Sequence, residues 1–112
     1  MTMTFSDVPE VGPGEVPAGA VVVDVREPEE WVAGHAAGAR HVPLSELPGR
    51  LNELPQSDQL FVVCRSGGRS ARAVEFLRGF GFDAVNVAGG TLAWHASNLP
   101  MVSENGQQPS AM

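Results

Sequence analysis

The sequence has one cysteine, no lysine and no long apolar run, and these shortages exclude several classes of protein. A single cysteine, Cys64, cannot form an internal disulfide, so the fold does not depend on an oxidising compartment. The longest unbroken apolar run, residues 60–64, has five residues, far fewer than the roughly 18 that a membrane-spanning helix needs. The first residues form neither the basic nor the apolar segment of an export signal. We therefore expect a soluble, cytoplasmic protein that does not bind membranes.

Metal sites and nucleic-acid surfaces also lack their usual residues. The three histidines are scattered, and no pair of them has the spacing of metal ligands. The formal net charge at pH 7 is −6, whereas general nucleic-acid binding needs a basic face. We expect no bound metal and no nucleic-acid partner.

The positive charge of the chain is concentrated around the cysteine. Residues 59–82 carry four arginines and one glutamate, a net charge of +3, whereas residues 1–58 carry −7 and residues 83–112 carry −2. Three arginines lie within eight residues of Cys64: Arg65, Arg69 and Arg72. Because arginine binds small oxyanions through two parallel hydrogen bonds, this stretch is a candidate site for a small anion.

Length and composition predict one compact α/β domain. The chain has 112 residues, of which 43% are hydrophobic and 18% charged, as in ordinary globular proteins. Apolar and β-branched runs predict an edge strand, a central buried strand and three further strands at residues 4–8, 20–25, 40–42, 60–63 and 84–87. The first of them is followed by an irregular connector, residues 9–19, rich in proline and glycine. Strands that alternate with helices predict a mostly parallel sheet covered by helices on both faces.

Helical signals lie between these strands. A helix is expected to begin near Pro28 and end at Gly34, and leucines at helical spacing in residues 44–54 are interrupted at Pro48. Thr91 is a candidate N-cap of a short last helix. In residues 70–80 the expected buried face consists of Ala73, Phe76, Leu77 and Phe80. We expect the polar residues 103–112 to be a disordered tail.

Cys64 follows a predicted buried strand and precedes a predicted helix. Ligands of open parallel sheets bind at the carboxyl ends of the strands. The loop between strand and helix contains glycines that let its amides turn inward, and the helix start favours negative charge. Such surroundings lower the pKa of a cysteine from about 8.5 toward about 3.5–7.5. We therefore expect Cys64 to be a nucleophilic thiolate. The loop consists of Cys64, Arg65, Ser66, Gly67, Gly68 and Arg69.

Several motifs of the chain resemble the single-domain rhodanese family. They are the stretch VVDVREP at residues 22–28, the pair Gly34-His35 with Gly38-Ala39 after it, the loop CRSGGRS at residues 64–70, and Gly89-Gly90 followed by Trp94 and Leu99-Pro100. They occur in the family's order and extend over about residues 4–102. The domain is therefore expected at residues 1–102, before the tail at 103–112.

The resemblance implies a five-stranded parallel sheet and a sulfurtransferase that needs no cofactor. Cys64 would accept sulfur from a small anionic donor such as thiosulfate, hold it as a persulfide, and pass it to a nucleophilic acceptor, cyanide or a thiol. The resemblance assigns binding of the donor to Arg65, Ser66, Gly67, Gly68 and Arg69. Asp24, Arg26 and Ser70 would support these residues from behind, with Asp24 orienting Arg69 or Ser70.

Other interpretations of the same residues stay open. The chain could be a persulfide relay that acts with a protein acceptor and turns over little free substrate. It could also be a phosphatase or arsenate reductase, although such enzymes place five residues between cysteine and arginine where this loop has four. Cys64 could be a buried structural thiol, and Arg69 could clamp the loop to Asp24 rather than bind the donor. Among the other residues, His35 is expected in a structural hydrogen bond, His41 and His95 at the surface, and Trp31 and Trp94 in the packing of the interior.

Overall fold

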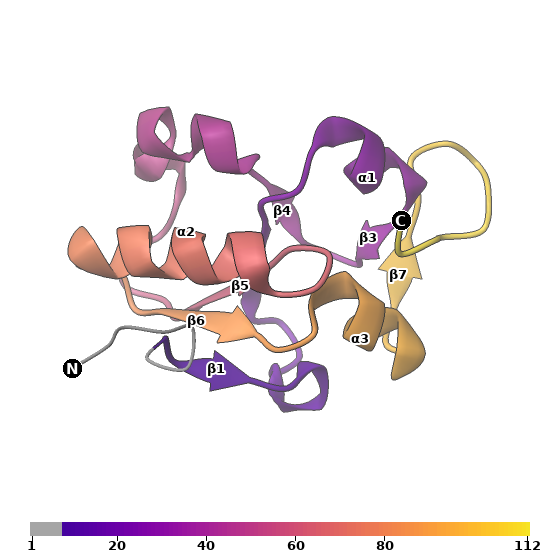
Figure 1. The fold of residues 1–112 in the computed structure, drawn as a ribbon, viewed down its shortest axis with the longest axis horizontal. Coiled ribbons are helices and arrows are strands. Elements are labelled where there is room, and N and C mark those ends of the chain that lie inside the picture. The colour runs from indigo at the N-terminus through magenta and orange to yellow at the C-terminus, as the bar shows by residue number, and fades with distance from the viewer. Residues whose placement is uncertain (1–7) are drawn as a thin grey trace.

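A parallel sheet of five strands organises the residues that the computed structural model describes, 8–112 (Figure 1). The strands are Glu10–Val11 (β1), Val21–Asp24 (β2), Arg40–His41 (β4), Leu60–Val63 (β5) and Ala84–Val87 (β6). Their order is β1-β6-β5-β2-β4, and each pairing is parallel. A separate antiparallel pair joins His35–Ala36 (β3) to Met101–Val102 (β7). The predicted α/β class is confirmed.

Both faces of the sheet are covered, as the apolar strands predicted. The helix Gly68–Gly79 (α2) covers one face together with the 3-10 helices Leu44–Gly49 (η3) and Leu51–Glu53 (η4). The helix Gly90–Ala96 (α3) and the 3-10 helix Pro13–Glu15 (η2) lie on the other face. All four residues of the central strand β5 are buried, and they alternate between the two clusters. The remaining helix, Pro28–Ala33 (α1), packs against β3 and ends at Gly34 as predicted.

The edge strand differs from the one expected. The predicted strand at residues 4–8 lies, apart from Val8, outside the described residues. The described edge strand β1 falls in the stretch expected to be an irregular connector. The Asn86 N–H donates to the Pro9 carbonyl and the Ala88 N–H to the Val11 carbonyl, both at 2.8 Å. Because Pro9 takes part as an acceptor, its missing N–H costs the sheet no hydrogen bond.

Two expectations about helix ends are wrong. Phe80 was expected on the buried face, but it is 57% exposed because α2 ends at Gly79. Its ring packs against Phe76, and Phe82, 4% exposed, enters the interior instead. Thr91 is not an N-cap, since the N-cap of α3 is Gly89 and Thr91 lies inside the helix.

The tail for which the sequence predicts disorder has a defined path in the structure, alongside α1 (Figure 1). The Glu104 N–H donates to the Val32 carbonyl and the Ser110 N–H to the Ala33 carbonyl, both at 2.9 Å. Carbonyls in the last turn of a helix have no partner within the helix. The tail therefore supplies donors that the end of α1 needs.

The two histidines near α1 make more contacts with the protein than the sequence indicates. His35 is buried, with Nδ1 3.0 Å from the Ala36 carbonyl and Nε2 2.7 Å from the Glu104 carboxylate, so the expected structural hydrogen bond is present. His41 was expected at the surface but is half-buried, with Nε2 2.8 Å from the Arg26 carbonyl. Both imidazole rings stack on Trp31, and this stacking explains why His41 is partly buried.

Within residues 8–112, every helix is too short or too polar to cross a membrane.

Candidate active site

The cysteine lies where the sequence places it, directly after β5 at the carboxyl edge of the sheet. Cys64 is 1% exposed. Two donors approach its sulfur: the Gly67 N–H at 3.1 Å and the Ser70 hydroxyl at 3.3 Å. Gly67 has φ 116°, a left-handed conformation that glycine adopts without strain, and this conformation precedes the first turn of α2. The loop therefore wraps the sulfur with hydrogen-bond donors.

These donors favour the thiolate form of Cys64. Burial raises the pKa of the thiol, but hydrogen bonds from the Ser70 hydroxyl and from the backbone amides of Ser70, Gly67 and Ser66 outweigh it. The pKa of Cys64 is consequently lowered from its ordinary value. A buried thiol held by apolar contacts alone would shift in the opposite direction, so the site has the electrostatics of a nucleophile.

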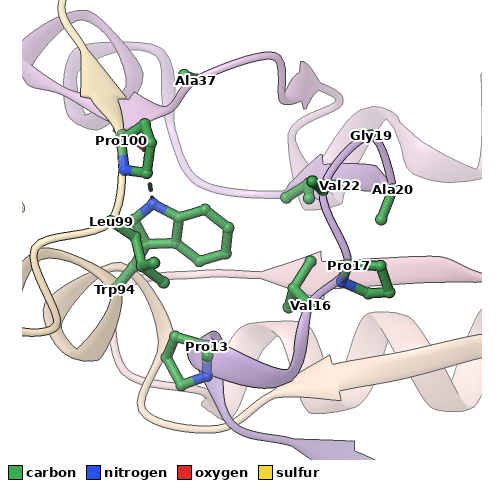
Figure 2. Close-up of a pocket in the computed structure, with 12 residues that line it drawn as sticks. Pro13, Val16, Pro17, Gly19, Ala20, Val22, Ala37, Trp94, Leu99 and Pro100 are labelled. Carbon is green, nitrogen blue, oxygen red and sulfur yellow. Dashed lines mark hydrogen bonds between the residues drawn. The ribbon is translucent and has the colours of Figure 1, made fainter.

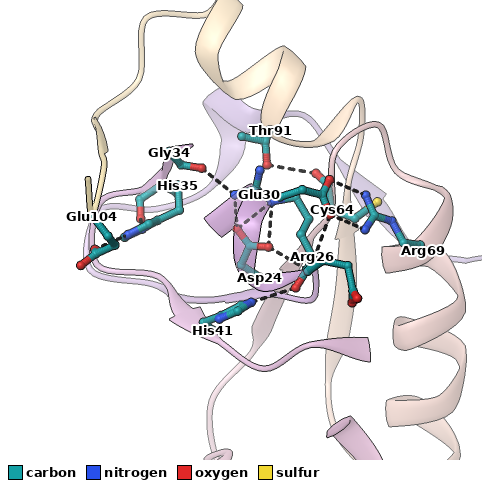
Figure 3. A network of polar contacts seen from close by, with 12 residues as sticks. Asp24, Arg26, Glu30, Gly34, His35, His41, Cys64, Arg69, Thr91 and Glu104 are labelled. Atoms are coloured by element: carbon teal, nitrogen blue, oxygen red, sulfur yellow. Dashed lines mark hydrogen bonds and ion pairs between the residues drawn. The ribbon is translucent and has the colours of Figure 1, made fainter. Parts of the chain in front are cut away.

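The start of α3 fixes the backbone on the other side of the cysteine (Figure 3). The Thr91 amide and hydroxyl both donate to the Cys64 carbonyl, at 2.8 and 3.0 Å, and the Leu92 amide donates to the Arg65 carbonyl at 3.1 Å. Gly90, with φ 60°, makes this approach possible because a Cβ atom there would collide with the carbonyl of Cys64. Thr91 and Gly90 thus belong to the site, and the Gly89-Gly90 turn was the only sign of them in the sequence.

Arg69 is held by a residue that the sequence analysis missed. Its guanidinium binds both carboxylate oxygens of Glu30 in α1, at 2.7 and 2.9 Å (Figure 3). The alternative in which Arg69 clamps the loop to Asp24 does not match the structure, because the carboxylate of Asp24 is occupied by Arg26. The hydrogen bonds with Arg69 lower the pKa of Glu30, and those with Glu30 raise the pKa of Arg69. We call the Arg69–Glu30 pair the loop clamp.

Asp24 and Arg26 form a buried ion pair at the end of β2. The Nη2 atom of Arg26 lies 2.8 Å from Asp24 and donates to the Gly34 carbonyl at 2.7 Å. Both side chains are fully buried. This pair joins the end of β2 to the end of α1, and α1 carries the Glu30 of the loop clamp. Through Arg26, the pair thus contacts the end of the helix that carries Glu30.

The other predicted residues divide into an outer and an inner group. Arg65 and Ser66 are exposed, whereas Gly67 and Gly68 are half-buried and Ser70 is buried. Ser70 was interpreted as a loop or cap residue supporting the site, but its hydroxyl reaches the sulfur itself. The same hydroxyl oxygen lies 2.5 Å from the side-chain oxygen of Asn86 in β6, a second residue that the sequence analysis missed.

A family comparison agrees with this geometry. The family model described as "Rhodanese-like domain" matches residues 14–97. The chain belongs to the rhodanese-like domain family. The resemblance inferred from the motifs is therefore confirmed.

Individual relatives of this rhodanese-like domain carry names that refer to sulfur. The chain is 39% identical over 80 residues to "Thiosulfate sulfurtransferase GlpE" of Pseudomonas putida, which covers 70% of this chain and 73% of that protein. It is 40% identical over 74 residues to "Putative sulfur carrier protein YrkF" of Bacillus subtilis, over 65% of this chain but only 40% of that protein. A crystal structure of a rhodanese-related protein from Thermoplasma volcanium superposes with a TM-score of 0.80 at 34% identity, covering 84% of this chain and 97% of that one.

An apolar cavity lies apart from this site (Figure 2). It has a volume of about 340 Å³ and lies near the amino end of β2, between Pro17, Val22 and Trp94. The Trp94 indole donates to the Pro100 carbonyl at 3.0 Å and is buried, which confirms its packing role. The cysteine loop of the rhodanese-like domain contributes no lining residue to this cavity.

We expect the loop clamp to contribute measurably to stability. In a double-mutant cycle of Arg69→Ala and Glu30→Ala, the coupling free energy of unfolding should be about 1 kcal/mol, because the contact is bidentate and partly buried. Since the pKa of Glu30 is depressed in the folded state, this coupling is present at neutral pH. It is lost as the pH falls below about 4.3, the ordinary value for glutamate.

The exposed pair of Arg50 and Glu46 is the matched control. Its coupling in chemical denaturation should be about 0.5 kcal/mol or less. Equal coupling for the two pairs, or none for Arg69 with Glu30, would show that the clamp has no special role in holding the loop.

Proposed function

We propose that this domain is a sulfurtransferase that carries a sulfane sulfur as a persulfide on Cys64. The observation that carries the proposal is the environment of the only cysteine: a buried sulfur at a strand end with hydrogen bonds from Gly67 and Ser70 and a lowered pKa. Membership in the rhodanese-like family, with a relative named a thiosulfate sulfurtransferase, supports the same reaction class.

The proposed reaction has two nucleophilic steps. In the first, the Cys64 thiolate attacks the outer sulfur of thiosulfate, a new sulfur–sulfur bond forms, and the old one breaks. Sulfite leaves with the electron pair of that bond. In the second step, cyanide or a thiolate attacks the outer sulfur of the persulfide, and Cys64 leaves as a thiolate. The balance closes without a metal or cofactor, as in other covalent catalysis.

Different residues of the loop have different tasks in this proposal. The loop amides, from Ser66 to Gly68, hold the negative charge of the donor and of the persulfide. Arg65 is exposed next to the cysteine and binds the anionic donor before the reaction. Arg69 holds the loop in shape through Glu30 rather than binding the donor. Asp24 and Arg26 support the loop from behind.

A second candidate function is a sulfur relay between proteins. The similarity to a protein named a sulfur carrier favours it, and so does the low exposure of Cys64, which restricts access to its sulfur. In a relay, a protein thiol would accept the sulfur and turnover with free cyanide would be slow. Parallel assays with thiosulfate as donor and either cyanide or thiols as acceptor distinguish the two functions.

The role of Arg65 provides a kinetic test of the proposed function. In a thiosulfate:cyanide assay, Arg65→Ala should raise the KM for thiosulfate and leave kcat nearly unchanged, because Arg65 binds the donor equally before and during the reaction. Rising salt should raise the wild-type KM more than that of the variant, since exposed charges are screened over about 8 Å at 0.15 M.

The matched control is Arg78→Ala. Arg78 lies in the last turn of α2 and donates to the Ala84 carbonyl at the start of β6, at the opposite end of the sheet from Cys64. This variant should keep the wild-type KM. A fall in kcat at constant KM for Arg65→Ala would contradict the proposed binding role.

A further inference from the structure

One buried amide contacts both residues that donate to the Cys64 sulfur. Asn86 lies in β6 and is 2% exposed. Its Oδ1 lies 2.5 Å from the Ser70 hydroxyl, and its Nδ2 lies 3.2 Å from the Gly67 carbonyl. The Nδ2 also lies 3.2 Å from the carboxylate of Glu10 in β1. Asn86 therefore connects the edge of the sheet to the cysteine loop without touching the sulfur.

These neighbours determine which end of the amide faces Ser70. An amide nitrogen is a donor only, and an amide oxygen is an acceptor only. The Gly67 carbonyl and the Glu10 carboxylate are both acceptors, so Nδ2 must face them. Turning the amide over would place Oδ1 against two oxygens in a buried position. The atom beside the Ser70 hydroxyl is therefore the acceptor Oδ1.

The Ser70 hydroxyl consequently has one hydrogen and two acceptors. Its oxygen lies 2.5 Å from Asn86 Oδ1 and 3.3 Å from Cys64 Sγ. A hydroxyl carries one hydrogen, so it cannot donate fully to both. We propose that Asn86 competes with the Cys64 sulfur for the hydrogen of Ser70, and that the hydrogen moves between them as the charge on the sulfur changes.

The charge on the sulfur decides which acceptor receives the Ser70 hydrogen at each stage of the sulfur-transfer cycle. This assignment of stages rests on the proposed function. While Cys64 is a thiol, its hydrogen points to Ser70 and the Ser70 hydrogen bonds to Asn86. When Cys64 is a thiolate, the Ser70 hydrogen turns to the sulfur and leaves Oδ1 unpaired. In the persulfide the inner sulfur is again neutral, and the hydrogen returns to Asn86. Asn86 is thus a positioning residue that stabilises the two neutral states of the sulfur.

Other charges also act on the ionisation of Cys64. Arg69 interacts with it directly through its positive charge. Charged groups on the elements packed around the cysteine also include Glu10, Asp24, Arg26, Glu29, Glu30, Arg65, Arg72, Glu75 and Arg78. Substitutions at Asn86 and Ser70 leave all of these charges in place, so a changed titration reports on the hydrogen bonds.

The test is a pH titration of the thiolate, followed by its ultraviolet absorbance, in the resting protein. Asn86→Leu should increase the ionisation constant of Cys64 by about threefold to tenfold, the effect of one hydrogen bond. Ser70→Ala should decrease it. Val85→Ala, in the same strand but facing the opposite cluster, should leave it unchanged.

The sign of the Asn86 effect separates competition from a structural role. If Asn86 served only to hold Gly67 in place, its loss would loosen a donor to the thiolate and decrease the ionisation constant. A decrease or no change in Asn86→Leu therefore overturns the proposal. Asn86→Ala, which removes the acceptor without adding volume, gives the same test if the leucine variant does not fold.

A second measurement uses the sulfur donor. At a fixed ratio of thiosulfate to sulfite, the ratio of persulfide to thiolate on Cys64 should be about threefold to tenfold lower in the Asn86 variants than in the wild type. An unchanged ratio contradicts the proposed return of the hydrogen to Asn86. If the wild type itself accepts no sulfur, the proposed function fails, whereas the titration, which needs no donor, still decides on Asn86.

Discussion

Replacement of Cys64 with serine should reduce sulfur transfer to the background rate while the protein stays folded. A serine hydroxyl in this position is not ionised and cannot form a persulfide. Cys64 is the only thiol in the chain, so no other residue can replace it. The fold should tolerate the change, because serine is smaller and can accept the same hydrogen bonds from Gly67 and Ser70. Transfer kinetics and thermal unfolding measure the two effects.

The control for this experiment is Ser45→Ala, an exposed position at the start of η3. It should keep both the activity and the melting temperature of the wild type. Undiminished transfer by Cys64→Ser would end the covalent account. Loss of folding would instead show that Cys64 is a structural thiol.

Gly90→Ala should destabilise the protein more than any other exchange of a left-handed glycine for alanine in the cysteine site. A residue with a Cβ atom loses about 1–2 kcal/mol in the left-handed region. At Gly90 that atom would also collide with the backbone carbonyl of Cys64 and contact the backbone of Arg65. Overpacking of this kind costs about 1–3 kcal/mol further. Sulfur transfer should fall with stability, because the collision moves the cysteine itself.

Gly81→Ala separates the two contributions. Gly81 has φ 88°, but a Cβ atom there would have nothing within 4 Å. Chemical denaturation should show a loss of stability for Gly81→Ala without loss of transfer, and a loss larger by about 1–3 kcal/mol for Gly90→Ala. Equal losses in the two variants would mean that the contact between α3 and the cysteine backbone is not tight.

Local patterns predicted the part of the site that is continuous in sequence. Residues 60–63 form an apolar run that can only be a buried element, and the glycines after Cys64 force a turn before the helix. Strand end, turn and helix start then place the cysteine among amides without any long-range information. The course of the loop was predictable because the strand end, the glycines and the helix start follow one another in the sequence.

Partners from distant segments could not be predicted in the same way. The resemblance suggested Asp24 as a partner for Arg69, yet Asp24 binds Arg26, two residues away, and its oxygens are then occupied. Glu30 reaches Arg69 because it stands at the third position of α1, where its carboxylate also accepts the Glu27 amide. Acidic residues are common at helix starts, so nothing in the sequence singled out Glu30 as the partner of Arg69.

The register of the strands determined the contacts of Asn86, which the sequence did not indicate. Asn86 faces the cysteine loop because it pairs with Glu10 on one side and Val62 on the other, and a shift of one residue would turn it to the opposite face. A lone asparagine in an apolar strand does not reveal that alignment. The tail is a similar case, since its path beside α1 depends on the Val32 and Ala33 carbonyls rather than on any pattern of its own.

Intact-protein mass spectrometry after treatment with thiosulfate tests the central claim most directly. Because Cys64 is the only cysteine, the mass change locates the sulfur without digestion. The wild type should gain the mass of one sulfur atom and lose it again on addition of cyanide, and Cys64→Ser should gain nothing. A wild type that gains no sulfur, or a serine variant that gains as much, would contradict the persulfide account.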